Sequence, residues 1–376
     1  DIALRHEEGN ILFTYPSLMA ITEHAHRYIT DGVMPDKAVS LLTEVVSAAA
    51  REKVPSITKE FVDAYVSNKT GIPTGPITAE EKEMLLNLET ILHKRVIGQH
   101  NAITAISSTM RRVRAGVQDK ERPMGSFLFL GSTGVGKTET AKALAAVFFE
   151  NEEMMHRLDM SEFSGLDALE RLIGKQGAVG VLAKMLKEHP YGVLLLDEFE
   201  KASTKVHDLF LQVIEEGFFT DFRGSRISAR NSIIIATSNA GSQAILEYIK
   251  QEENPADKKN EIIDLIIREG ILKPELMNRF DSIVIFEPLS LTDREQIARL
   301  LLTDLQERIR QKGYELVVDE VLISLLTTEG YTPQFGARPM RRVLQDHVEE
   351  KIAEKIIKGN LKKGDTIWFV EEDFKK

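Results

Sequence analysis

The segment Gly131-Ser132-Thr133-Gly134-Val135-Gly136-Lys137-Thr138 is the most informative part of this chain for predicting its fold. It satisfies the phosphate-loop pattern G-x-x-x-x-G-K-(S/T) and lies between a short apolar run and a helical stretch. Its glycines allow consecutive backbone N–H groups to surround phosphates at a helix N-terminus, where the helix dipole also favours anions. Lys137 would reach the β and γ phosphates of ATP, and Thr138 would hold Mg²⁺. An ordinary glycine turn is the alternative, but the flanking strand and helix favour the nucleotide site.

Five short apolar runs separated by helical stretches predict a parallel sheet covered by helices on both faces. The candidate strands are residues 127–130, 156–158, 193–196, 233–237 and 283–286. We therefore expect an α/β fold with a doubly wound, five-stranded parallel sheet.

Two acidic residues, Asp197 and Glu198, follow the buried run 193–196 directly. Ligands of such sheets bind at the carboxyl ends of the strands. Asp197 would therefore bind the Mg²⁺ shell, and Glu198 would polarise the water that attacks the γ-phosphate. A solvated acidic turn is the alternative.

Asn239 follows the next apolar run and would hold that water by hydrogen bonding. Taken alone, such a residue is more often a helix cap or turn asparagine. Its position after the two acidic residues favours the catalytic interpretation.

Three domains are expected along the chain. Residues 1–75 form a helical small domain, 76–288 the large ATPase domain, and 289–376 a mostly helical small domain. Prolines and glycines at residues 71–76 exclude a helix and mark the first boundary. Capping boxes are predicted at Thr78 with Glu81 and at Thr292 with Glu295.

Composition excludes several classes of protein. The net charge of −10 opposes a generic nucleic-acid binder, and the absence of cysteine excludes disulfides and thiolate metal sites. The apolar runs are too short to span a membrane. The chain begins at Asp1, without an initiator Met or a signal region, which indicates a fragment of a longer protein. We expect a cytoplasmic location of bacterial type, or an organelle matrix.

The order of the motifs resembles the second ATPase module of the double-ring Clp proteins of the AAA+ class. The resemblance rests on these segments and on Asn239: residues 92–99, 122–127, 131–138, 194–198, 278–281 and 336–339. It covers nearly the whole chain, since residues 28–38 look like part of the small domain that closes the preceding module. The family implies ATP/ADP binding, a homo-oligomer that forms a hexameric ring, and protein substrates.

The resemblance also assigns further site residues. Arg279 looks like the arginine finger that reaches a neighbouring subunit, and Arg338 looks like the second sensor of its own subunit. A surface salt bridge is the alternative for either arginine. Val96 and Ile97 would line the adenine pocket, although an apolar pair is as readily core.

The sequence departs from the family at the loop that grips polypeptide. Ala178, within residues 174–180, stands where an aromatic residue between glycines is usual, and the loop is about six residues shorter. Whether the shortening is natural, engineered or an incomplete segment is left open by the sequence.

Two other family features are absent. No I-G-(F/L) tripeptide for docking a peptidase lies between Thr237 and Arg279. No long heptad insertion, and hence no coiled-coil middle domain, lies between the helix that contains Ala38 and the linker at Pro73. A protein unfoldase therefore competes with a nucleotide-gated assembly subunit that does not thread substrate, and with the regulatory ATPase of a Clp-like protease. A nucleic-acid-remodelling ATPase would need a basic pore or an added binding domain, and neither is apparent in the sequence.

Overall fold

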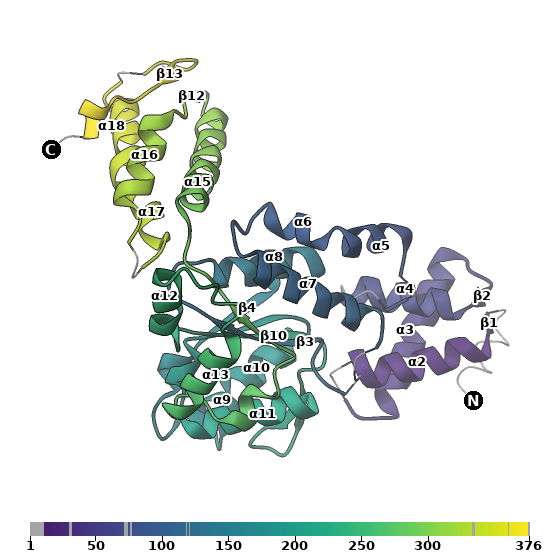
Figure 1. Cartoon of the computed structure of the whole chain (residues 1–376). Coiled ribbons are helices and arrows are strands. Elements are labelled where there is room, and N and C mark those ends of the chain that lie inside the picture. The colour runs from purple at the N-terminus through teal and green to yellow at the C-terminus, as the bar shows by residue number, and fades with distance from the viewer. Residues whose placement is uncertain are drawn as a thin grey trace.

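A computed structural model of the chain describes residues 11–29, 32–70, 74–75, 77–117, 119, 121–332, 335–359 and 361–374 (Figure 1). Of the predicted linker, residues 71–73 and 76 lie outside the described residues. Among the described helices, none combines the length and apolar character that crossing a bilayer requires.

A five-stranded parallel sheet forms the centre of the molecule, in the order β11-β3-β10-β7-β4. The strands are β3 (Gly125–Leu130), β4 (Met155–Asp159), β7 (Gly192–Asp197), β10 (Ser232–Ser238) and β11 (Ser282–Ile285). The five predicted strands are confirmed, each within one or two residues at its ends. Strand β10 lies between β3 and β7, so the segment after β10 reaches the sheet edge between the ends of those two strands.

Both faces of the central strands β3, β7 and β10 are buried, which explains why these strands are largely apolar, whereas the edge strand β4 carries the exposed Arg157. Phe127 and Phe129 of β3 join one hydrophobic core, whereas Leu128 and Leu130 join another on the opposite face. The first core includes α7 (His100–Arg114) and α8 (Lys137–Phe148). The helices of the second core are α9 (Ala168–Ile173), α10 (Val181–Glu188), α11 (Thr204–Glu216), α12 (Ser242–Lys250), α13 (Lys259–Arg268) and α14 (Pro274–Met277).

The N-terminal helices pack onto the first core. They are α2 (Tyr15–Tyr28), α3 (Asp36–Glu52), α4 (Lys59–Thr70), α5 (Ala79–Leu86) and α6 (Leu88–His93), and β1 (Leu12–Phe13) pairs in parallel with β2 (Ser56–Ile57). Thr78 caps α5 as predicted, because its side chain accepts a hydrogen bond from the Glu81 N–H. The Glu81 carboxylate pairs with Arg114 instead of completing the predicted capping box.

A separate core joins the C-terminal elements, which project from the sheet domain in Figure 1. They are α15 (Leu291–Gln311), α16 (Glu320–Glu329), α17 (Arg338–Val343), the π-helical segment η4 (Leu344–Glu349) and α18 (Glu350–Ile357). Strand β12 (Glu315–Leu316) pairs in parallel with β13 (Thr366–Ile367), and η5 (Glu371–Phe374) follows.

The predicted capping box at the start of α15 is wrong. Ser290, not Thr292, is the N-cap, and its reciprocal partner is Asp293 rather than Glu295. The Ser290 backbone is extended, whereas Thr292 already lies inside the helix, where its hydroxyl cannot occupy the cap position.

Short elements complete the described fold. Two antiparallel hairpins are β5 (Gly174–Lys175) with β6 (Ala178–Val179), and β8 (Phe218–Thr220) with β9 (Arg226–Ser228). Three single-turn helices are η1 (Glu152–Met154), η2 (Met160–Phe163) and η3 (Phe199–Lys201).

Candidate functional site

The phosphate-loop motif forms the turn between β3 and α8, and α8 begins at Lys137. Gly134 and Gly136 have φ of 75° and 109°, a region that residues with side chains rarely adopt. A Cβ at Gly131 would lie 2.7 Å from the Phe286 carbonyl oxygen, so the backbone there is closely packed. Of the remaining loop residues, Ser132 and Val135 are buried, and Thr133 and Thr138 are half-buried.

Lys137 points into the protein rather than toward solvent, and only 8% of the residue is exposed. Its Nζ donates to the carbonyl oxygens of Gly131 at 2.5 Å and Ser238 at 3.1 Å, and to Asn239 Oδ1 at 2.9 Å. Burial lowers the pKa of Lys137 to about 8, although nearby carboxylates oppose that shift. The amine is therefore a cation held by weak neutral acceptors, which an anion would stabilise.

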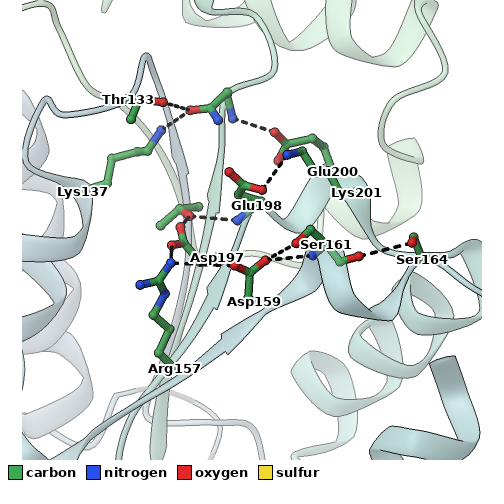
Figure 2. Close-up of polar contacts among 12 residues, drawn as sticks. Thr133, Lys137, Arg157, Asp159, Ser161, Ser164, Asp197, Glu198, Glu200 and Lys201 are labelled. Carbon is green, nitrogen blue, oxygen red and sulfur yellow. Dashed lines mark hydrogen bonds and ion pairs between the residues drawn. The ribbon is translucent and has the colours of Figure 1, made fainter. Parts of the chain in front are cut away.

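Asp197 ends β7 beside the neighbouring strands. Its carboxylate accepts a short hydrogen bond from the Thr237 hydroxyl on β10 and forms an ion pair with Arg157 of β4 at 2.7 Å. Asp197 also lies close enough to Lys137 to raise the pKa of the amine. Figure 2 shows Lys137, Asp197 and Glu198 gathered at the carboxyl ends of the strands.

Glu198 occupies a left-handed backbone conformation, with φ of 57°. Its N–H donates to Thr237 Oγ1 at 3.3 Å, and its carboxylate pairs with Lys201 at 2.6 Å. A non-glycine residue in this region is uncommon and costs conformational energy, so the contacts of the β7 end hold Glu198 in place.

Asn239 links the phosphate loop to the acidic segment. Its Oδ1 accepts from Lys137 at 2.9 Å and from the Thr133 hydroxyl at 3.5 Å. Its backbone N–H donates to Glu200 Oε1 at 3.1 Å. The structure thus brings Lys137, Asn239 and the acidic residues of the β7 end together, as the strand order requires.

The proposed adenine-pocket residues lie beneath the loop. Val96 is 2% exposed, and a Cβ on Gly136 would lie 3.9 Å from the Val96 side chain. Ile97 is half-buried. Gln99 has φ of 57°, and its side-chain amide donates to the Val135 carbonyl at 3.1 Å.

The C-terminal domain touches the phosphate loop through the residues before Arg338. The Ala337 N–H donates to the Gly134 carbonyl at 3.1 Å, and the Arg338 backbone nitrogen would lie 3.1 Å from a Cβ on Gly134. Arg338 begins α17, and its side chain is exposed.

Arg279 lies at the other end of β3. Asp281, two residues further on, donates its N–H to the Ser126 carbonyl near the start of that strand. The Arg279 guanidinium is 48% exposed and pairs with Glu215 at 3.0 Å. Its carbonyl accepts a 2.6 Å hydrogen bond from Arg122. The structure therefore separates Arg279 from the phosphate loop of its own chain.

The loop with the missing aromatic residue is a tight hairpin. Gly174 pairs with Val179 and Lys175 with Ala178, and Gly177 turns the chain with φ of 87°. Ala178 and Val179 are exposed.

Sequence reasoning missed Gln99, Arg157 and Glu200. Gln99 lies within the segment 92–99 that carries the resemblance, but its bonds to the Val135 and Glu287 carbonyls depend on tertiary packing. Arg157 and Glu200 reach site residues that lie 40 and 39 positions away along the chain, at Asp197 and Asn239. No local pattern predicts either contact.

The chemistry of this site fits a nucleoside triphosphate with Mg²⁺. The glycine-lined turn offers backbone N–H groups at the start of α8. Lys137 supplies a buried cation whose present hydrogen-bond acceptors are uncharged. Asp197 and the Thr138 hydroxyl are oxygen ligands of the kind that Mg²⁺ prefers.

Family models match most of the sheet domain and the C-terminal domain. Residues 122–283 match the AAA domain (Cdc48 subfamily), and residues 289–369 match the C-terminal, D2-small domain of ClpB protein.

Curated relatives include the chaperone protein ClpB of Staphylococcus aureus (strain COL), 42% identical over 317 residues, and that of Aquifex aeolicus, 41% identical over 321 residues. Both matches cover 83% of this chain, but only 36% and 32% of the respective relatives. The chain therefore spans about a third of the length of these relatives.

Solved structures are similar over nearly the whole chain. A closed-state reconstruction of Hsp104 with ATPγS and FITC casein has a TM-score of 0.83 at 31% identity, over 98% of this chain and 65% of that one. The extended S. cerevisiae Hsp104:casein complex has a TM-score of 0.84 at 31% identity, over 97% of this chain and 64% of that one.

Proposed function

Because this chain belongs to the Clp-type AAA+ ATPases and resembles their second module, we propose that it hydrolyses ATP to remodel other proteins within a ring of identical subunits. The observation that carries the proposal is the meeting of Lys137, Asp197, Glu198 and Asn239 at one edge of the sheet. A cytoplasmic location stays a prediction.

The phosphate loop binds the nucleotide. Lys137 exchanges its carbonyl partners for the β and γ phosphates, and this exchange stabilises a buried cation that now has only neutral acceptors. Thr138 and Asp197 would hold Mg²⁺, which would neutralise phosphate charge. In the present structure Asp197 pairs with Arg157 at 2.7 Å.

Glu198 and Asn239 act on the attacking water. The Glu198 carboxylate accepts its proton, after exchanging its present contact with the exposed Lys201. Asn239 fixes the water's position through its side-chain amide. Val96 and Ile97 form the apolar side of the adenine pocket, as the family implies.

Arg279 acts in trans. It lies at the amino end of β3, whereas the phosphate loop lies at the carboxyl end, about 16 Å away at 3.3 Å per residue. An exposed guanidinium at this position suits a neighbouring subunit's γ-phosphate, where it would supply on the order of 10³ to 10⁵ in rate. A head-to-tail ring, hexameric in our proposal, is the assembly that repeats such a contact at every interface.

Arg338 acts in cis. The contact of Ala337 with Gly134 supports this role, because it brings the start of α17 against the phosphate loop. Nucleotide binding would thereby be coupled to the orientation of the C-terminal domain.

Two measurements test the ATPase proposal. Lys137→Ala should weaken the binding of a fluorescent ATP analogue, whereas Arg279→Ala should bind it normally and lose turnover. If wild-type chain, assembled and supplied with Mg²⁺, hydrolyses no ATP above the Lys137→Ala background, the proposal is wrong.

The exposed hairpin with Ala178 favours a second candidate, a nucleotide-gated assembly subunit that does not thread polypeptide. Alanine offers little apolar area for gripping a substrate. Unfolding of a fluorescent protein substrate separates the two: ATP-dependent loss of fluorescence supports the motor, and ATP hydrolysis without unfolding supports the assembly subunit. Restoration of unfolding by Ala178→Tyr would identify the missing aromatic residue as the cause.

A further inference from the structure

We propose that Glu200 is a positioning residue for hydrolysis: its carboxylate holds the backbone of Asn239 and thereby fixes where the Asn239 side chain points. The inference rests on the proposed ATPase function and deepens it. Glu200 belongs to neither the phosphate loop nor the pair of acidic residues assigned to Mg²⁺ and water.

The backbone of Asn239 needs such support because β10 ends one residue earlier, at Ser238. The Ser238 carbonyl still accepts from Gly131 at 3.2 Å, but the chain then turns through Gly241, with φ of 73°, into α12. The Asn239 N–H thus leaves the sheet. Glu200 Oε1 accepts this N–H at 3.1 Å, in place of a strand partner.

The backbone of Glu200 is held in place by its neighbours. It lies within the single turn η3, between Phe199 and Lys201. Phe199 is fully buried, and its carbonyl accepts a 2.9 Å hydrogen bond from His207 of α11. Because the backbone of Glu200 is fixed in this way, its carboxylate can hold the backbone of Asn239 in one position.

The carboxylate of Glu200 is not explained by folding alone. Its second oxygen, Oε2, is buried and has no hydrogen-bond partner among the described residues. A buried carboxylate oxygen without a partner destabilises the fold, so its retention points to a role in the site.

The contacts form a chain across the site. Lys137 Nζ donates to Asn239 Oδ1 at 2.9 Å, and the Asn239 N–H donates to Glu200 at 3.1 Å. When Lys137 turns to the phosphates, Asn239 loses its strongest side-chain contact in the present structure. The hydrogen bond from its N–H to Glu200 then remains, and it keeps Asn239 at the position from which its side chain contacts the attacking water.

Three substitutions of Glu200 separate the effect of its side-chain length from the effect of its negative charge. Glu200→Gln keeps an acceptor oxygen at the same reach, Glu200→Asp keeps the charge but is one methylene shorter, and Glu200→Ala removes both. We expect kcat for ATP to stay within about twofold for the Gln variant. It should fall about tenfold for the Asp and Ala variants, the loss of one hydrogen bond to a charged group. KM should change little in all three, because nucleotide contacts remain.

Controls exclude a general structural effect. Glu216→Ala removes an exposed glutamate that accepts one hydrogen bond from Gln212 at 2.9 Å, and it should leave kcat unchanged. In an Asn239→Ala background, Glu200→Ala should cause no further loss of kcat, because both act through the same side chain. If Glu200→Ala does not fold, the difference in kcat between the Gln and Asp variants still tests the inference.

The inference is overturned if the Gln variant loses as much kcat as the Ala variant, if the two losses with Asn239→Ala multiply, or if KM rises instead of kcat falling. Failure of the proposed function looks different. In that case Asn239→Ala and Glu198→Gln would themselves retain wild-type hydrolysis, whatever Glu200 does.

Discussion

The geometry of Arg279 leads to a quantitative prediction about mixed assemblies. The residue sits near Ser126, at the amino end of β3, and the phosphate loop begins five residues later at Gly131. The resulting separation of about 16 Å exceeds the length of one arginine side chain. Arg279 therefore cannot complete the active site of its own subunit, but it can complete that of a neighbour.

Two inactive variants should consequently restore each other. Arg279→Ala keeps Glu198 but offers no finger, with an expected loss on the order of 10³ in rate. Glu198→Gln keeps its finger but cannot activate water. In a random equal mixture, about a quarter of the interfaces join an intact Glu198 to an intact Arg279, so hydrolysis should recover to about a quarter of the wild-type rate.

The assay is steady-state ATP hydrolysis after the two variants have exchanged subunits, with assembly checked by size-exclusion chromatography. The matched control replaces Glu198→Gln with the double variant Glu198→Gln, Arg279→Ala, which cannot complete any interface. A mixture no faster than the sum of its components would refute the assignment in trans. The present ion pair of Arg279 with Glu215 should not interfere, because an exposed pair contributes at most about 1 kcal/mol.

Other predictions address the water, the turn at Asp221 and the loop contact. Glu198→Gln alone should retain nucleotide in a filter-binding assay but stop phosphate release; continued release contradicts its role. Burial raises the pKa of Asp221, but the Ser225 N–H, Lys187 and the Arg223 N–H outweigh it and lower the pKa overall. Its stabilisation is thus present above the unfolded pKa of about 4 and lost as pH falls through the lower folded value. Asp221→Asn should therefore lower Tm more at about pH 6 than at about pH 3, and equal effects would exclude this linkage. Gly134→Ala should weaken nucleotide binding, because its Cβ would lie 2.1 Å from the Phe335 carbonyl; unchanged affinity would show that the loop contact is dispensable.

Features that depend on neighbouring residues could be predicted from the amino-acid sequence. A continuously apolar strand followed by glycines, Lys137 and Thr138 predicted a phosphate loop at the edge of a buried parallel sheet, and the five strands are confirmed. These patterns are readable because strand burial and loop conformation impose local requirements on residue type. Successive side chains of a strand point to opposite faces of the sheet, which is why alternate residues of β3 join the two different cores.

The contacts between segments that are remote in the sequence became known only from the folded structure. Strand β10 lies between β3 and β7, which brings Asn239 to both Lys137 and Glu200, and Arg279 comes to the opposite sheet end. The sequence predicted Thr292 as the cap of α15, whereas the fold places Ser290 at that position. Strand order and helix entry depend on packing between distant residues, whose free energy no local pattern encodes.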